Sequence, residues 1–237
     1  MASRILLAIV LSFARMAVAA ESAPEHPSAQ FGQLLFKDDF REGLGQWHVE
    51  LEKPGVVAAN IGMLNVDVPA GATLWFKPAL RGPVAIVFEA MAVSAGGRND
   101  RVSDLNCFWM ARNRDGVSPV YARKRSGKFD DYNNLLTYYV GLGGNSNTTT
   151  RFRRYIGDPV TRPLLPEHDL SSPETLLKAN RWQTITVIAR GTQIEYWRNN
   201  ERLIQFTDDE PYREGWFALR TTQSHLRLEK FRVYALK

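Results

Sequence analysis

The fold is decided most clearly by residues 182–197, which read WQTITVIAR-GT-QIEYW. Two runs rich in β-branched and aromatic residues flank Gly191-Thr192, and such runs on either side of a two-residue turn are typical of a β-hairpin. A second turn follows at Asn199-Asn200, before another apolar run at 202–206. This stretch therefore predicts three consecutive antiparallel strands.

The same pattern extends over the rest of the chain. Short apolar or alternating runs occur at 34–40, 56–68, 73–80, 84–93, 104–112, 135–142, 148–156, 215–222 and 226–236. No segment of helical length keeps a 3.6-residue hydrophobic period, although residues 172–178 could form one or two helical turns. So many strands with turns between them predict an all-β sandwich or barrel. The terminal runs 34–40 and 231–236 are expected to pair as antiparallel neighbours.

The first twenty residues have the parts of a secretory signal peptide. Arg4 supplies the positive charge, a short apolar run follows, and residues 17–20 offer the small residues that a signal peptidase requires. The apolar run is too short to cross a bilayer. We therefore expect residues 1–20 to be removed on export, residues 21–33 to form a flexible linker, and residues 34–237 to form one domain. The mature protein is then expected to be periplasmic or extracellular, without membrane insertion.

Charge and cysteine content argue against several functions. Thirty Lys and Arg residues against 25 Asp and Glu residues give a net charge of +5 at pH 7. This mild excess does not indicate nucleic-acid binding, but it suits a neutral or acidic ligand. Cys107 is the one cysteine, so no intrachain disulfide can form. Its place in an apolar run predicts a core residue rather than a catalytic thiol.

Several segments resemble a known superfamily. The opening FKDDF (36–40), the late hairpin and the closing residues 215–233 are similar to concanavalin A-like lectin and glucanase domains. DLNCFW (104–109) and residues 141–155, which begin GLGGNSNTT, resemble a narrower group of uncharacterised bacterial domains often associated with pectin and rhamnogalacturonan breakdown. The resemblance implies a two-sheet antiparallel β-sandwich of jelly-roll topology, in which sugars lie across one solvated sheet.

Alternation along the strands predicts which side chains point to that solvated face. It places Tyr139, Arg151, Arg153 and Tyr155 there. Two guanidinium groups about 7 Å apart on one strand face could bind a carboxylate through paired hydrogen bonds. We expect Arg151 and Arg153 to be a carboxylate clamp and Tyr139 or Tyr155 to be the general base or acid. The alternative is a solvated outer face whose arginines pair with scattered Asp and Glu residues.

The full candidate set is larger. The expected catalytic residues are Tyr139, Tyr155, Arg151, Arg153 and His168, and the expected substrate-binding residues are Asn106, Asn145, Asn147, Trp216, Arg220 and His225. Asn145 would orient the substrate, but it and Asn147 could equally cap their own turn.

The same alternation predicts which side chains point into the core. Ala111 is expected in the core with Leu105, Cys107 and Trp109, and the tryptophans Trp182 and Trp197 are expected to anchor the late hairpin. Arg154 would also point inward and would need a carboxylate partner. The candidates for that partner are Glu167, Asp169 and Asp104.

This inventory fits β-elimination better than hydrolysis. Retaining glucanases on this fold carry a Glu-x-Asp-x-(x)-Glu strand, which places two carboxylates about 5.5 Å apart. The sequence contains no such strand. A uronate lyase instead needs a cation or amide at the carboxylate and a Tyr or His as base and acid. We therefore expect an exported enzyme of the lyase type that degrades uronate-containing polysaccharide. The alternatives are a non-catalytic carbohydrate-binding module and a structural or partner-binding domain.

The ligand and cofactor expectations follow from the same residues. The expected partner is a polysaccharide or oligosaccharide, neutral or acidic. No cofactor is expected, because no spacing resembles a zinc site. A structural calcium site built from backbone and Asp oxygens is an open alternative.

Overall fold

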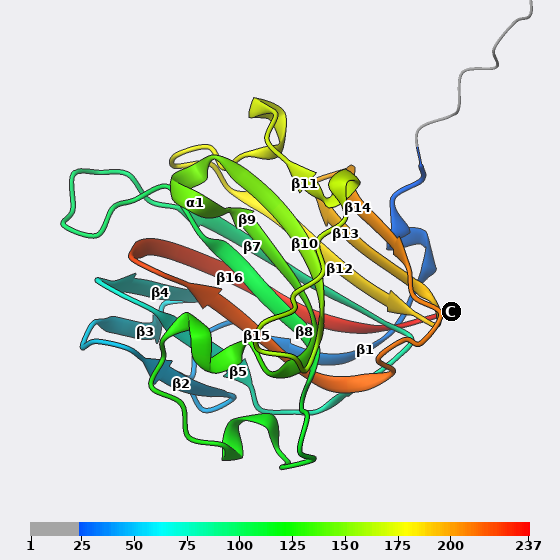
Figure 1. Ribbon diagram of the computed structural model, residues 1–237. Coiled ribbons are helices and arrows are strands. Elements are labelled where there is room, and N and C mark those ends of the chain that lie inside the picture. The colour runs from blue at the N-terminus through cyan, green and yellow to red at the C-terminus, as the bar shows by residue number, and fades with distance from the viewer. Residues whose placement is uncertain (1–23) are drawn as a thin grey trace, which may run out of the picture.

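The computed structural model describes residues 24–237 and shows two stacked antiparallel sheets of eight strands each (Figure 1). The back sheet has the order β14-β13-β12-β7-β16-β4-β3, with β1 paired to β16. The front sheet has the order β11-β10-β9-β8-β15-β5-β2, with β6 paired to β15. The prediction of an all-β, two-sheet antiparallel sandwich is confirmed. The predicted signal peptide, residues 1–20, lies outside the described residues.

The strands of the two sheets are interleaved along the chain. The front sheet contains β2 (Trp47–Leu51), β5 (Ala72–Phe76), β6 (Leu80–Arg81), β8 (Leu105–Asn113), β9 (Leu135–Gly143), β10 (Thr149–Ile156), β11 (Asp169–Leu170) and β15 (Glu214–Thr221). The back sheet contains β1 (Phe31–Asp38), β3 (Val56–Asn60), β4 (Met63–Val68), β7 (Val84–Ala92), β12 (Gln183–Arg190), β13 (Gln193–Arg198), β14 (Glu201–Thr207) and β16 (Ser224–Leu236). The expected pairing of the terminal strands is confirmed by β1 and β16.

Within residues 24–237, helical structure is limited to single turns. These are η1 (Pro27–Gln30), η2 (Val120–Ala122), η3 (Phe129–Tyr132), η4 (Pro166–His168), η5 (Pro173–Thr175) and the four-residue turn α1 (Gly144–Asn147). In the described part of the chain, no helix is long and apolar enough to cross a bilayer.

The main core lies between the two sheets. It is filled by alternate side chains of the facing strands, among them Leu105, Cys107, Trp109, Tyr138 and Val140. Cys107 is fully buried there, and burial raises the pKa of its thiol far above the usual value. The expectation that Cys107 is a core residue is therefore confirmed.

A second apolar cluster lies on the other, outer face of the front sheet. The connection between β8 and β9, residues 114–134, folds back over this face and is called the lid segment below (Figure 1, green). Its Val120 and Tyr132 are fully buried against Trp75, Phe108 and other aromatic residues of the sheet. The face expected to be solvated is therefore partly covered.

Four details of the predicted packing are wrong. Ala111 lies in the outer cluster and Met110 takes its place in the core, because a bulge interrupts β8 between Trp109 and Arg112. Trp182 is 41% exposed, whereas Trp197 is buried on the outer side of the back sheet.

Arg154 and the linker account for the other two differences. Arg154 is paired, but with Asp208 (Nε–Oδ2 2.8 Å) rather than with any of the three predicted partners. The expected linker also ends early: residues 27–30 form η1, β1 begins at Phe31, and His26 packs edge-on against Trp197.

Candidate functional site

Two rows of residues cross the outer face of the front sheet. Residues paired directly across neighbouring strands share a face. The polar row consists of Glu50, Thr73, Arg220, Asn106, Gly141, Arg151 and Asp169. The aromatic row consists of His48, Trp75, Ala218, Phe108, Tyr139 and Arg153. Alternation therefore assigned Tyr139 and the arginine stripe to one face correctly.

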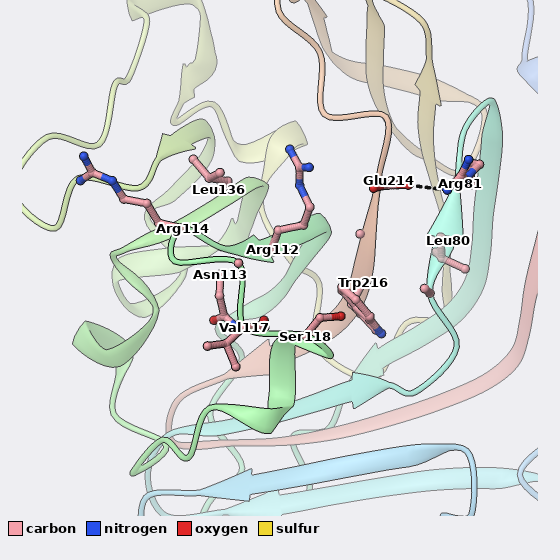
Figure 2. A pocket seen from close by; sticks show the side chains of 13 residues that line it. Leu80, Arg81, Arg112, Asn113, Arg114, Val117, Ser118, Leu136, Glu214 and Trp216 are labelled. Carbon is pink, nitrogen blue, oxygen red and sulfur yellow. Dashed lines mark hydrogen bonds and ion pairs between the residues drawn. The ribbon is translucent and has the colours of Figure 1, made fainter.

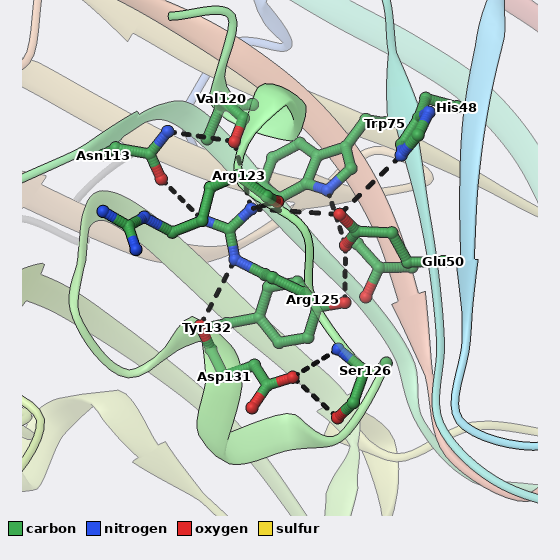
Figure 3. Close-up of polar contacts among 12 residues, drawn as sticks. His48, Glu50, Trp75, Asn113, Val120, Arg123, Arg125, Ser126, Asp131 and Tyr132 are labelled. Atoms are coloured by element: carbon green, nitrogen blue, oxygen red, sulfur yellow. Dashed lines mark hydrogen bonds and ion pairs between the residues drawn. The ribbon is translucent and has the colours of Figure 1, made fainter. Parts of the chain in front are cut away.

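Glu50 anchors the lid segment to β2 and β5 (Figure 3). Its Oε2 atom accepts hydrogen bonds from Trp75 Nε1 at 3.0 Å and from the hydroxyl of Tyr132 at 2.6 Å. Its Oε1 atom lies 3.9 Å from Arg125 Nη1 and 3.9 Å from His48 Nε2. Because Glu50 is only 5% exposed, this carboxylate is committed to holding the lid.

Further contacts fix the middle of the lid to the sheet. Arg125 donates to the side-chain oxygen of Asn113 at 2.5 Å and to the carbonyl of Val120 at 3.0 Å. Arg220 of β15 donates to the carbonyl of Gly127 at 2.7 Å. Gly127 has φ +84°, and a Cβ there would lie 2.3 Å from the backbone nitrogen of Glu52. Only glycine allows this close approach. The part of the outer face on β2, β5 and the adjoining half of β15 and β8 is therefore closed, and we call it the lidded half.

Tyr139 lies at the boundary of the lid. Its ring packs between Phe108 and Phe129, at centroid distances of 5.0 and 5.7 Å, and the residue is 8% exposed. Its hydroxyl reaches over Gly141, where a Cβ would lie only 2.9 Å away. Within residues 24–237 this hydroxyl has no hydrogen-bond partner. Burial raises the pKa of Tyr139 well above the usual value, so the phenol is held in its neutral, proton-bearing form.

Two polar atoms further along the polar row are buried without a hydrogen-bond partner among the described residues. They are Oδ1 of Asn106, which is 2% exposed and pairs with Gly141, and Nε of Arg220, which is 1% exposed and lies one strand further away. Other atoms of the same side chains are paired: Nδ2 of Asn106 donates to Asp104 at 3.3 Å, and Nη1 of Arg220 donates to Gly127 at 2.7 Å. Because both side chains are almost fully buried, they support the sheet and do not form its surface.

Beyond Gly141 the polar row is more exposed. Arg151 forms two hydrogen bonds to Asp169, at 2.7 and 3.0 Å, and both side chains are about a third exposed. This pair raises the pKa of Arg151 and lowers that of Asp169. Arg153 donates to the carbonyl of Arg162, and no described carboxylate lies within ion-pair distance of it. We call the surface formed by Arg151, Arg153, Asp169 and the Tyr139 hydroxyl the open half.

The structure differs from the expected carboxylate clamp and the expected general base. Arg151 is already paired with Asp169, so Arg153 is the stripe arginine left to meet an anion. Tyr155 is fully buried with its hydroxyl 3.5 Å from Arg162 Nη1, and burial raises the pKa of this tyrosine. Tyr155 consequently does not reach the surface beside Tyr139. Arg162 was missed, because residues 157–168 carry no periodicity that reveals where their side chains point.

The other predicted residues are scattered. His168 is 4% exposed and packs edge-on against Phe152, with Nε2 3.1 Å from the carbonyl of Gln205. His225 lies between Asp100 and Asn65, at 2.7 and 2.9 Å.

The two asparagines of the turn α1 are bonded within the protein. Asn145 adopts a left-handed conformation (φ 52°) and donates to Thr149, which corresponds to the capping alternative. Asn147 is bonded to the backbone of Leu177 and so ties the turn to a distant segment. Trp216 lies beyond the far side of the lid and lines a separate cleft.

No group of three or more His, Cys, Asp or Glu side chains suited to a metal ion occurs in the part of the chain that the structure describes.

Solved structures with the same architecture define the class of fold. A protein of unknown function with a galectin-like fold from Bacillus subtilis is 15% identical, with a TM-score of 0.67 over 86% of this chain and 96% of that one. The carbohydrate-binding module CBM66 from Bacillus subtilis is 10% identical (TM-score 0.54, 80% and 96% covered). An endo-β-1,3-glucanase from Pyrococcus furiosus is 9% identical (TM-score 0.58, 91% and 99% covered). The chain thus has the galectin and glucanase type of β-sandwich.

The sequence itself identifies the family. Residues 66–231 match the family described as "Domain of unknown function (DUF6250)", and the chain belongs to this family. No curated protein matches the sequence. The superfamily resemblance is confirmed at the level of fold, and the association with pectin breakdown stays a prediction.

Proposed function

We propose that this protein binds an acidic carbohydrate on the open half of the front sheet. The observation that carries the proposal is the cross-strand pairing of Tyr139 with Arg153, which has no carboxylate partner in residues 24–237. A sugar hydroxyl is both a donor and an acceptor, so it can pair with the Tyr139 hydroxyl while a carboxylate on the same ligand meets Arg153.

The charge of the open half favours an acidic sugar. Arg153 has no carboxylate partner in residues 24–237, and Arg162 lies beside it. Partial burial lowers the pKa of Arg153, because desolvation penalises its charged form. A carboxylate on the ligand would offset that penalty. The neighbouring folds include a carbohydrate-binding module and a glucanase, which supports carbohydrate as the ligand class.

β-Elimination on a uronate is the second candidate. It is favoured by the direct pairing of Tyr139 with Arg153 across β9 and β10, which places a phenol beside a carboxylate-binding cation. The raised pKa of Tyr139 suits a proton donor and disfavours a general base. Since elimination needs a base as well, binding without turnover is the function that this geometry supports best.

One titration separates these functions. Purified mature protein is mixed with galacturonate oligosaccharides, rhamnogalacturonan oligosaccharides and neutral galactose oligosaccharides, and heat of binding and ultraviolet absorbance are both recorded. We expect saturable binding of an acidic oligosaccharide with no rise in absorbance. A rise would report the double bond that β-elimination creates and would establish the lyase instead. No binding to any acidic oligosaccharide would refute the proposal.

The export of this protein is part of the same proposal. A carbohydrate-binding surface of this kind meets polysaccharide outside the cytoplasm, and residues 1–20 read as a signal peptide. Fractionation of cells that express the whole chain should recover a shortened protein outside the cytoplasm. Recovery of full-length protein in the cytoplasm would contradict export.

A further inference from the structure

Two adjoining cavities lie at one end of the sandwich, away from the open half. One, of about 500 Å³, runs between β6, the end of β8, the start of the lid and the start of β15 (Figure 2). The other, of about 710 Å³, continues around the end of the sandwich past Gly82, Gly191 and Tyr212. They share Arg81, Arg112 and Glu214 as walls, so they form one continuous feature, which we call the arginine cleft.

The cleft is strongly cationic. Five arginines line it, namely Arg81, Arg112, Arg114, Arg190 and Arg213. Glu214 is the single acidic residue among the described residues that line either cavity, and it is already bound to Arg81 at 2.7 Å. Like charges gathered around one concave surface raise its potential and attract anions. The uncompensated charge therefore indicates an anionic ligand.

Arg112 occupies the wall common to both cavities. Its Nε atom is buried and has no hydrogen-bond partner in the described part of the chain. Its guanidinium carbon lies 5.9 Å from the centre of the Tyr212 ring, which supports the planar group from one side. No described residue accepts from the two Nη atoms of Arg112, so these donors are free for the two oxygens of a carboxylate or sulfate.

Trp216 gives the cleft an apolar wall. Its Nε1 atom donates to the carbonyl of Lys77 at 3.1 Å, which fixes the ring and leaves its face to contact a ligand. Leu80 and Leu136 line the same cavity (Figure 2). A ligand that fits has both an apolar face and more than one anionic group. Sugar rings that carry carboxylates or sulfates have these properties, since the C–H face of a sugar can lie on an indole ring.

We propose that the arginine cleft is a second binding site, for an oligosaccharide whose rings carry oxyanions. The site does not depend on the open half. The two share no residue, and the lid segment lies between them, with its residues 116–118 lining the cleft and Phe129 packing against Tyr139 at the border of the open half. The oxyanion is either a uronate carboxylate or a sulfate ester. The test below distinguishes them, because it compares a uronate oligosaccharide with a sulfated one.

The test uses protein in which the open half is disabled by Tyr139→Phe together with Arg153→Met. Calorimetry then measures the binding of galacturonate oligosaccharide and of a sulfated galactose oligosaccharide of the same length. Two cleft variants are added to this background: Arg112→Met, and Arg213→Met at an exposed position, where substitution is less able to disturb folding. Arg41→Met, an exposed arginine in the loop before β2, is the matched control.

We expect the background protein to bind one of the two oligosaccharides. Arg112→Met and Arg213→Met should each weaken that binding about tenfold or more, because each removes a charge-assisted contact. Arg41→Met should leave it unchanged. Preference for the uronate or for the sulfated sugar identifies the oxyanion. Absence of saturable binding by the background protein, or equal binding by both cleft variants and the control, would overturn the second site without affecting the proposal for the open half.

Discussion

The lidded half and the open half belong to the same sheet face, yet their polar side chains differ in how many partners they have within the protein. Under the lid, the carboxylate of Glu50 and the guanidinium of Arg125 meet several partners each within the protein. In the open half, Arg153 has no carboxylate within ion-pair distance among the described residues, and it pairs across the strands with Tyr139. A single unpaired buried atom does not separate the halves, since Oε1 of Glu50 also lacks a hydrogen bond. The dense pairing under the lid indicates a structural role, whereas a cation without a carboxylate partner leaves the open half able to bind an anionic ligand.

Removal of the anchor of the lidded half should have the largest effect. Glu50→Ala leaves Arg125 buried without its carboxylate and removes the acceptor of Trp75 and Tyr132. Loss of one partner of a buried pair costs about 3–5 kcal/mol. Urea denaturation should show a decrease of that size in the free energy of unfolding. Glu89→Ala is the control, because its pair with the exposed Lys230 should contribute about 1 kcal/mol or less. Equal effects of the two variants would contradict the assignment of Glu50 as an anchor.

The open half should respond in binding rather than in stability. Arg153→Met keeps most of the side-chain stem but removes the cation that meets the ligand carboxylate. Affinity for galacturonate oligosaccharide should fall about tenfold or more, as expected for a charge-assisted contact. Affinity for a neutral galactose oligosaccharide should not change. An equal loss of affinity for both sugars would show that Arg153 maintains the shape of the surface and does not bind the ligand carboxylate.

The smallest expected effect concerns the ion pair at the edge of the open half. Arg151 lowers the pKa of Asp169 below the usual value of 3.8, so the pair stabilises the fold above that pH. This contribution is lost as the pH falls through the pKa of the folded state. Because the pair is partly exposed, Asp169→Asn should lower the free energy of unfolding at pH 7 by about 1 kcal/mol or less.

The measurement for this prediction is a pH series of denaturation curves. The difference between wild type and Asp169→Asn should vanish at low pH, whereas the exposed Asp209→Asn should behave as wild type throughout. If the difference in free energy of unfolding persists below the pKa of folded Asp169, the substitution destabilises the fold by a route other than the loss of the carboxylate charge.

Much of the fold could be read from the sequence, because each strand carries its own alternation. The late hairpin and the pairing of terminal strands needed only local patterns and turn residues. The lid could not be predicted in this way, because residues 114–134 show no period and their burial depends on Glu50, far away in the sequence. Alternation also failed at the β8 bulge, which moved Met110 inward and Ala111 outward.

For the candidate site, the sequence could predict only which side chains share one face of the sheet. Alternation placed Tyr139, Arg151 and Arg153 together, and the register agrees. Alternation could not show that Asp169 forms an ion pair with Arg151, or that other side chains cover Tyr155. Both contacts depend on elements outside β10. The arginine cleft was missed for the same reason: Arg81, Arg112, Arg190 and Arg213 come from four separate segments.

Tyr139→Phe tests the central claim most directly, because it removes one hydroxyl and nothing else. The account predicts that calorimetric affinity for galacturonate oligosaccharide falls about five- to tenfold, the value of one hydrogen bond, while the free energy of unfolding does not decrease. Tyr138→Phe, whose hydroxyl donates to Asp208 at 2.6 Å inside the core, should show the reverse: lower stability in the same urea titration. Unchanged affinity in Tyr139→Phe, with a loss of stability like that of Tyr138→Phe, would contradict a ligand site on the open half.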